Sequence, residues 1–152
     1  MNGSQTIPSR TDIDVHGSLD EACASKNFLG KSLDEAEALF RDNSLRYQED
    51  LLWMGPVAFR FYIHAAINYV QSEQATGDSD IINCLAGTLS FWHEHYPAEL
   101  VPCARDLADF CRTVLEQFDR FDADPKIYVG LREQYQHLAE LFTRNSNETG
   151  NA

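Results

Sequence analysis

The sequence predicts an all-α protein, a bundle of four long helices with a short helical element before them. Apolar residues recur at spacings of three and four along several segments, which is the periodicity of a helix with one buried face. Strand signals are nearly absent, because no alternating apolar run of useful length occurs. The pair Gly55-Pro56 opens an almost continuously apolar segment, which is typical of a helix buried inside a bundle.

The chain is expected to form one helical domain between two polar ends. Residues 1–27 are polar and are predicted to form a loosely ordered leader, residues 28–143 the domain, and residues 144–152 a polar tail. With 152 residues, the chain is long enough to bury about two thirds of the surface that its unfolded form exposes.

The short helical element is expected to begin at Ser32, because Ser32 and Glu35 have the spacing of a capping box. The run Asp42-Asn43-Ser44 indicates a break, after which Leu45–Trp53 forms another turn or two. Proline is well suited to the first turn of a helix, so the central helix is expected to begin at Pro56.

The other long helices are delimited by turn residues and prolines. Ser79 or Asp80 caps the long segment after the central helix, which ends at Tyr96-Pro97. The last segment follows Pro125, and its apolar stripe includes Ile127, Tyr128 and Leu131. The four long helices are expected at residues 56–74, 79–95, 102–121 and 125–143.

The net charge of the chain makes some classes of binding partner unfavourable. The chain has 24 acidic and 12 basic residues, a net charge of −12. Such a chain is repelled by nucleic-acid phosphates and by anionic lipid, so we expect neither nucleic acid nor a membrane as partner. The first residues have no signal-peptide pattern, and the four cysteines follow no metal-binding spacing, which predicts a cytoplasmic protein with reduced thiols. A basic protein remains a possible partner, and acidity that only maintains solubility is the alternative.

A line of polar residues on the central helix has two interpretations. Arg60, His64, Asn68 and Gln71 are spaced by four, four and three residues, so they share one face. In the first interpretation they line a pocket, with His64 as a base or ligand and Arg60 as an anion clamp. In the second they form a strip at the bundle surface or a polar network between helices.

The sequence does not match the residue spacings of the metal-binding and covalent-catalysis motifs compared with it. His93 and His95 are two residues apart and diverge on a helix. The acids Asp119, Asp122 and Asp124 lack the glycine and the closing glutamate of a calcium loop. No nucleophile elbow or glycine-rich phosphate loop is present, and the cysteines at positions 103 and 111 fit a core better than a reactive site. We therefore expect no catalytic residue, metal or cofactor.

Acidic residues near aromatic ones are the preferred candidates for partner binding. Carboxylates steer a basic protein, and aromatic side chains anchor it. Trp92 is a further candidate anchor. The residues predicted to bind a partner are Asp34, Glu37, Asp42, Trp53, Asp78, Asp80, Glu94, Tyr96 and Glu99.

Residues 28–70 resemble a family of small uncharacterised bacterial helical proteins. The resemblance rests on Phe28-Leu29-Gly30-Lys31 and on the segment Asp50–Tyr62, which has the pattern DLxxMGPxAFxxY. Leu29 stands between the phenylalanine and the glycine, which is a departure from the family's opening motif. The resemblance implies a bacterial protein and carries no established activity or site residue.

Three functional hypotheses follow. The first is a non-enzymatic cytoplasmic protein-binding module, in its specific form an immunity or inhibitor protein for a basic bacterial toxin. The alternative is a small enzyme or ligand-binding bundle with a pocket at Arg60, His64 and Asn68. The third is a self-associating module with Trp53 and Trp92 at the interface, so a monomer or a homodimer is expected.

Overall fold

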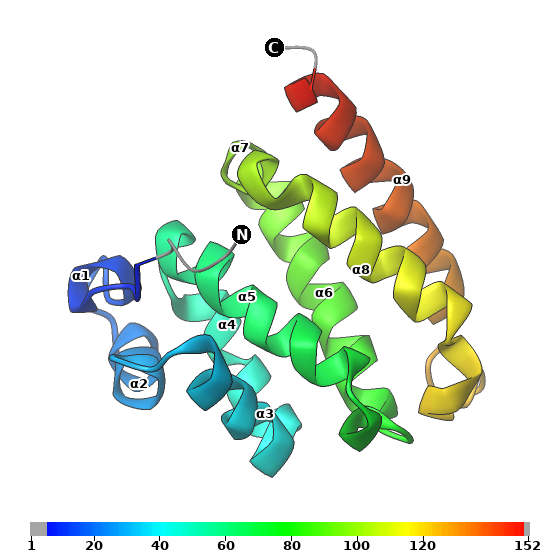
Figure 1. Cartoon of the computed structure of the whole chain (residues 1–152), viewed down its shortest axis with the longest axis horizontal. Helices are drawn as coiled ribbons and strands as arrows, with labels where there is room; N and C mark the ends of the chain where they lie inside the picture. The colour runs from blue at the N-terminus through cyan, green and yellow to red at the C-terminus, as the bar shows by residue number, and fades with distance from the viewer. Residues whose placement is uncertain (1–5, 151–152) are drawn as a thin grey trace. The chain divides into compact units, whose positions relative to one another are not determined.

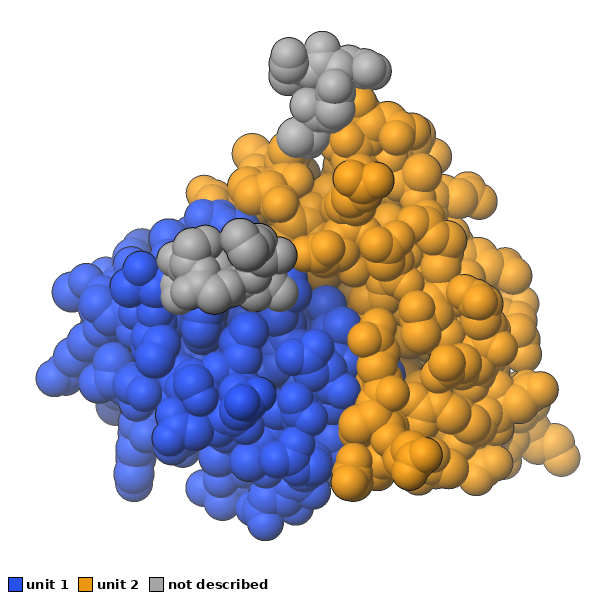
Figure 2. All heavy atoms as spheres, viewed as in Figure 1, with its two compact units in different colours: residues 1–70 blue, residues 71–152 orange. Residues whose placement is uncertain are grey.

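The computed structural model describes residues 6–150, and these residues form helices and turns with no strand. The fold is an all-α helical bundle, which confirms the predicted class (Figure 1). The chain divides into two compact units, residues 1–70 and 71–152, where the sequence analysis expected one domain (Figure 2). The helices are α1 (Arg10–Ile13), α2 (Leu19–Phe28), α3 (Leu33–Gln48), α4 (Asp50–Trp53), α5 (Pro56–Gln71), α6 (Ser79–His95), α7 (Pro97–Leu100), α8 (Ala104–Glu116) and α9 (Leu131–Gly150), with 3₁₀ turns η1 (Glu73–Ala75), η2 (Val101–Cys103) and η3 (Phe118–Phe121).

The expectation of a loosely ordered leader is wrong for residues 10–27, which contain α1 and most of α2. Each helix begins with a capping box, in which a serine and an acidic residue three positions later exchange hydrogen bonds. The pairs are Ser9 with Asp12 and Ser18 with Glu21. Ile13 in α1 and Phe28 in α2 are completely buried. Residues 1–5 lie outside the described residues.

Glu21 organises the connection between α1 and α2. Its carboxylate accepts hydrogen bonds from the backbone amides of Val15 at 2.9 Å and His16 at 2.8 Å, and from the amide and hydroxyl of Ser18. Burial raises the pKa of this carboxyl, but hydrogen bonds from the Ser18 hydroxyl and the backbone amides outweigh that effect. They lower the pKa from 4.5 to about 2.

Glu21 is therefore expected to make the free energy of unfolding of this protein decrease as the pH falls in the acidic range. Because its pKa is lower in the folded state, its contribution is complete above the unfolded value of 4.5 and is lost as pH falls through about 2. Glu21→Gln should lower the free energy of unfolding at pH 7 by about 1–2 kcal/mol. Denaturant titrations from pH 7 to pH 2 should show a smaller loss in the variant than in the wild type. Parallel losses would contradict this role.

The core of the first unit is an aromatic cluster around Phe28. The Phe28 ring lies 6.0 Å from Phe40, 6.5 Å from Tyr47 and 5.0 Å from Tyr62, measured between ring centroids. The Tyr62 hydroxyl lies 2.8 Å from the carbonyl oxygen of Phe28 and 2.9 Å from that of Lys31, and it donates to them. Burial raises the pKa of Tyr62 to about 12, so it remains a donor. Tyr62 thus fixes the turn that follows α2.

The junction of α4 and α5 holds the first helix in place. The Gly55 amide donates to the carbonyl oxygen of Ile13 at 3.1 Å, so the backbone of α1 passes directly over Gly55. A Cβ atom at Gly55 would lie 2.4 Å from the carbonyl oxygen of Asp12. Glycine is required here because the two backbones approach this closely. We refer to this contact as the Gly55–Ile13 clip.

The central helix follows the prediction closely. It begins at Pro56, and its buried residues occupy most of its circumference. The break predicted near position 43 is also present, because Asn43 has φ −158° and ψ 83° inside the α3 segment. Gln71, its last residue, already belongs to the second unit.

The second unit is built on the hairpin of α8 and α9, which run in opposite directions and pack along their length (Figure 1). Helix α6 also packs against α9, and the Tyr135 hydroxyl of α9 donates to the carbonyl oxygen of Ile82 in α6. Phe110 and Phe142 are completely buried between these helices. Helix α6 begins and ends within a residue of the prediction, although the cap is Asp78, whose carboxylate accepts from the Ile81 amide at 3.2 Å.

Three boundaries in this unit differ from the prediction. Helix α8 ends at Glu116 instead of position 121, because the chain turns into η3. Helix α9 begins at Leu131, after Gly130 with φ 74°, a conformation that suits glycine. The tail predicted from position 144 continues as helix to Gly150, since no glycine or proline interrupts it earlier. Residues 151 and 152 lie outside the described residues.

Candidate functional site

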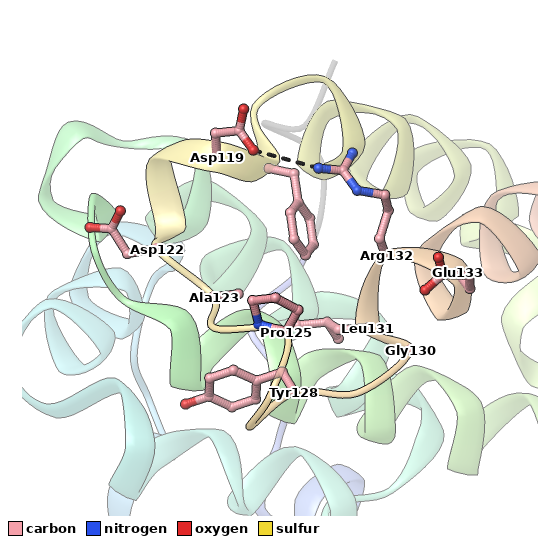
Figure 3. Close-up of a pocket in the computed structure, with 10 residues that line it drawn as sticks. Asp119, Asp122, Ala123, Pro125, Tyr128, Gly130, Leu131, Arg132 and Glu133 are labelled. Atoms are coloured by element: carbon pink, nitrogen blue, oxygen red, sulfur yellow. Dashed lines mark hydrogen bonds and ion pairs between the residues drawn. The ribbon is translucent and has the colours of Figure 1, made fainter.

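The connection between α8 and α9, residues 117–130, and the first turn of α9 line an open hollow of about 320 Å³. Figure 3 shows Pro125 and Leu131 side by side in the middle of this hollow, with Asp119, Asp122 and Glu133 around its edge. Phe118 contributes an aromatic wall. The hollow therefore combines an apolar floor with a carboxylate rim. Its lining residues are Phe118, Asp119, Asp122, Ala123, Pro125, Tyr128, Gly130, Leu131, Arg132 and Glu133.

Tyr128 and Arg120 fasten this connection to residues 72–80, the segment that leads into α6. The Tyr128 hydroxyl donates to the Asp80 carboxylate at 2.5 Å and accepts from the Ser79 hydroxyl at 3.2 Å. The hydrogen bond to Asp80 raises the pKa of Tyr128. On the other side, the Arg120 guanidinium donates to the carbonyl oxygen of Ser72 at 3.3 Å, and the Arg120 carbonyl oxygen accepts from the Gly77 amide at 2.9 Å.

This anchoring exposes two apolar side chains. The amides of Ile127 and Tyr128 both donate to the carbonyl oxygen of Asp124, which closes a tight turn. Tyr128 reaches Asp80 on α6, whereas Ile127 is 70% and Val129 83% exposed. Ile127 and Val129 are named the apolar tip below. Ile127 and Val129 therefore present two neighbouring apolar side chains to solvent on an anchored turn, where a partner can contact them.

Arg132 lies over the aromatic wall of the hollow. Its guanidinium carbon is 4.5 Å from the centroid of the Phe118 ring, a cation–π distance. Its Nη2 atom is 3.5 Å from an Asp119 carboxylate oxygen (Figure 3). The Asp119 carboxylate is fully exposed, so this ion pair adds little to stability.

The predicted partner-binding residues of the second unit lie at the two opposite ends of α6. Asp80 bonds to Tyr128 and thus lies beside the connection, while the Asp78 carboxylate caps α6. Glu94 lies about 21 Å from Asp80 along the helix axis, because 14 residues separate them. Tyr96 is 51% exposed and, with Glu99, follows that far end. One end of the predicted surface therefore adjoins the hollow, and the other does not.

The candidates in the first unit lie on α3 and α4. Asp34 and Asp42 are exposed, and Trp53 is 44% exposed. Glu37 is half-buried and forms an ion pair with Arg41 at 2.7 Å, so its charge is partly neutralised within α3. Asp34, Asp42 and Trp53 have the exposure that partner binding needs, and the role of all four residues stays a prediction.

Trp92 does not qualify as a surface anchor. It is only 3% exposed, and its ring lies 5.2 Å from that of Tyr96. The sequence analysis placed Trp92 among exposed aromatics and at a possible dimer interface. A buried position excludes both roles, because the apolar periodicity of α6 turns this residue into the core.

The polar line on α5 is partly engaged within its own helix. The His64 Nδ1 atom is 2.9 Å from the carbonyl oxygen of Arg60, one turn earlier. Arg60 and His64 are half-buried, and Asn68 is exposed. None of these three residues lines the hollow of the α8–α9 connection, or a second hollow of about 380 Å³ whose lining residues are Arg10, Ala22, Ser25, Lys26 and Leu29. A pocket at Arg60, His64 and Asn68 stays a prediction.

The candidate nucleophiles Cys103 and Cys111 lie in the core. Cys103 and Cys111 are buried, as predicted, and burial raises the pKa of Cys111 to about 12, so it remains a thiol. Among the side chains of residues 6–147, no group of three histidine, cysteine or acidic residues is placed to hold a metal ion. No helix in that range is long and apolar enough to cross a membrane.

Sequence reasoning missed the hollow and the apolar tip. It assigned Ile127 to the buried stripe of the last helix, because Ile127 and Leu131 are four residues apart. Gly130 was the signal that separates them, since a glycine directly before a helical stripe often marks a turn. No protein-family model, curated protein or solved structure matches this chain.

Proposed function

We propose that this chain is a non-enzymatic, cytoplasmic protein-binding module whose partner is a basic protein. The observation that carries the proposal is the apolar tip, two exposed side chains on an anchored turn beside a carboxylate rim. In protein complexes, apolar side chains at the centre of the contact supply affinity, and charges around them supply orientation and a fast association rate. The net charge of −12 favours a partner of opposite sign.

The fixed geometry of the connection supports the same function. A loop that is already ordered loses little conformational entropy when a partner binds. The contacts of Tyr128 with Asp80 and of Arg120 with Ser72 provide this order before any partner arrives. The specific form that we propose is an inhibitor of a basic bacterial toxin. This form also rests on the bacterial resemblance of residues 28–70.

Removing the apolar tip should abolish partner binding. The full chain, immobilised, is expected to retain a basic protein from an extract of its own host, identified by mass spectrometry. The double substitution Ile127→Ser and Val129→Ser should reduce retention at least about tenfold, since truncation of a central contact residue costs more than about 1 kcal/mol. Retention by the wild type should fall as salt rises from about 50 to 500 mM.

Leu19→Ser is the matched control, because Leu19 is 86% exposed in the first unit and equally apolar. It should retain the same protein as the wild type. Equal retention by the tip variant, a captured partner that is acidic, or a salt-insensitive complex would contradict the proposal.

A further inference from the structure

We infer that the hollow of the α8–α9 connection is a seat for one arginine side chain of the basic partner. The inference rests on the proposed function and names the group that the partner inserts. A volume of about 320 Å³ is at the lower limit of small-molecule sites, which suits a single long side chain better than a cofactor.

The lining matches the two parts of an arginine side chain. Pro125 and Leu131 offer an apolar floor to its aliphatic stem, and Phe118 offers a ring face to its planar guanidinium. Asp119 and Glu133 lie at the edge of this floor, whereas the Asp122 carboxylate points away from Pro125 and Leu131 (Figure 3). Arginine pairs with carboxylates through a planar fork of donors and stacks on aromatic rings, whereas lysine is a compact charge without that planarity.

The chain itself shows that the hollow accepts a guanidinium. Arg132 lies over the Phe118 ring at 4.5 Å and reaches Asp119 at 3.5 Å, which are the two contacts expected of an inserted arginine. This observation is independent of the acidic rim, because it shows a cation in contact with the aromatic wall. Arg132 therefore acts as an internal stand-in for the partner's residue.

Arg132 is weakly held and can be displaced. Its side chain is 45% exposed, and ion pairs in such positions contribute little. It supplies one positive charge beside the two carboxylates of Asp119 and Glu133, so an excess of negative charge remains for a second cation. An arginine delivered by a partner that also covers the apolar tip would exclude water from these contacts and strengthen them.

The seat can be tested without the partner. N-acetyl-arginine methylamide, titrated into the full chain and followed by ¹H–¹⁵N spectra, should give saturable shifts at residues 118–119 and 130–133. N-acetyl-citrulline methylamide has the same shape without the charge, and it should bind at least about tenfold more weakly, because charged hydrogen bonds are about twice as strong as neutral ones. Shifts that do not saturate, or equal shifts with citrulline, would overturn the inference.

Two substitutions should move the affinity in opposite directions. Arg132→Met removes the internal cation, keeps an apolar stem, and should tighten arginine binding about two- to fivefold; Phe118→Leu removes the ring and should weaken it by a similar factor. Arg112→Met is the matched control, since it removes an exposed arginine that pairs with Asp109 on α8 away from the hollow. Equal effects of the two arginine substitutions would mean that only net charge matters, and the seat would be rejected.

The outcomes separate the seat from the proposed function. Saturable arginine binding at the hollow, with a captured partner that is acidic, would uphold the seat and reject the basic-protein function. A basic partner that is lost with the apolar tip but retained equally by Arg132→Met, Phe118→Leu and wild type would uphold the function and reject the seat. Circular dichroism of Phe118→Leu verifies its fold, and the exposed Arg132 variant keeps the test decisive if that variant unfolds.

Discussion

Phe28→Ala is expected to lower the free energy of unfolding by about 3–5 kcal/mol, the largest effect of any substitution considered for this protein. The Phe28 side chain is completely buried, and its ring contacts those of Phe40, Tyr47 and Tyr62. Alanine would leave a cavity between α2, α3 and α5. It would also loosen the turn at which the Tyr62 hydroxyl meets the Phe28 carbonyl oxygen. Denaturant titration followed by circular dichroism measures the change.

The adjacent residue provides a matched control. Leu29 is 45% exposed, so Leu29→Ala should cost less than about 1 kcal/mol. A similar loss in both variants would show that residues 28–29 act through chain flexibility instead of core packing. Trp53 and Trp92 lie in different units, so the fluorescence of Trp53→Phe and Trp92→Phe backgrounds assigns each loss to one unit.

Gly55→Ala is expected to destabilise the protein by about 1–3 kcal/mol, a typical cost of overpacking. The new Cβ atom would lie 2.4 Å from the carbonyl oxygen of Asp12 and 2.5 Å from the Val15 side chain. A backbone oxygen cannot rotate away as a flexible side chain can, so α1 must lift from the junction and the Gly55–Ile13 clip must lengthen. Hydrogen exchange at the Gly55 amide should accelerate well beyond the change in global stability.

Gly87→Ala should have the opposite effect on the free energy of unfolding. Gly87 lies within α6, and a Cβ atom there would meet nothing within 4 Å. Alanine is the better helix former by about 0.5–1 kcal/mol, so Gly87→Ala should stabilise the protein by that amount. A stabilising Gly55→Ala would show that α1 does not rest on the junction as described.

Local signals explain the elements that the sequence predicted well. The capping box at Ser32, the proline at position 56 and the turn before α6 each involve only a few consecutive residues. Each signal can therefore be recognised in the sequence. Residues 10–27 were misjudged because α2 has a nearly uniform polarity around its axis. Its place in the fold depends on Phe28, whose ring contacts residues up to 34 positions away.

One acidic residue beside the candidate site was predicted from the sequence, but the acids that line the hollow and its geometry were not. Asp80 was chosen from composition, and the structure places it beside the connection. The hollow depends on contacts between residues 48 positions apart, Tyr128 with Asp80 and Arg120 with Ser72. No pattern within a short segment encodes such a pairing. The apolar tip was hidden because Ile127 has helical spacing to Leu131, and only Gly130 marks the turn.

The Gly55–Ile13 clip has a practical consequence for the design of N-terminal truncations for expression. A shortened polypeptide that starts at Phe28, where a reading of composition alone would cut, loses both helices whose residues cover the α4–α5 junction. Leu51 and Met54, which are buried at this junction, would then face water and promote precipitation during purification. Affinity tags should therefore be appended ahead of Ser9, and protease-cleavage sites should not replace the segment that follows it.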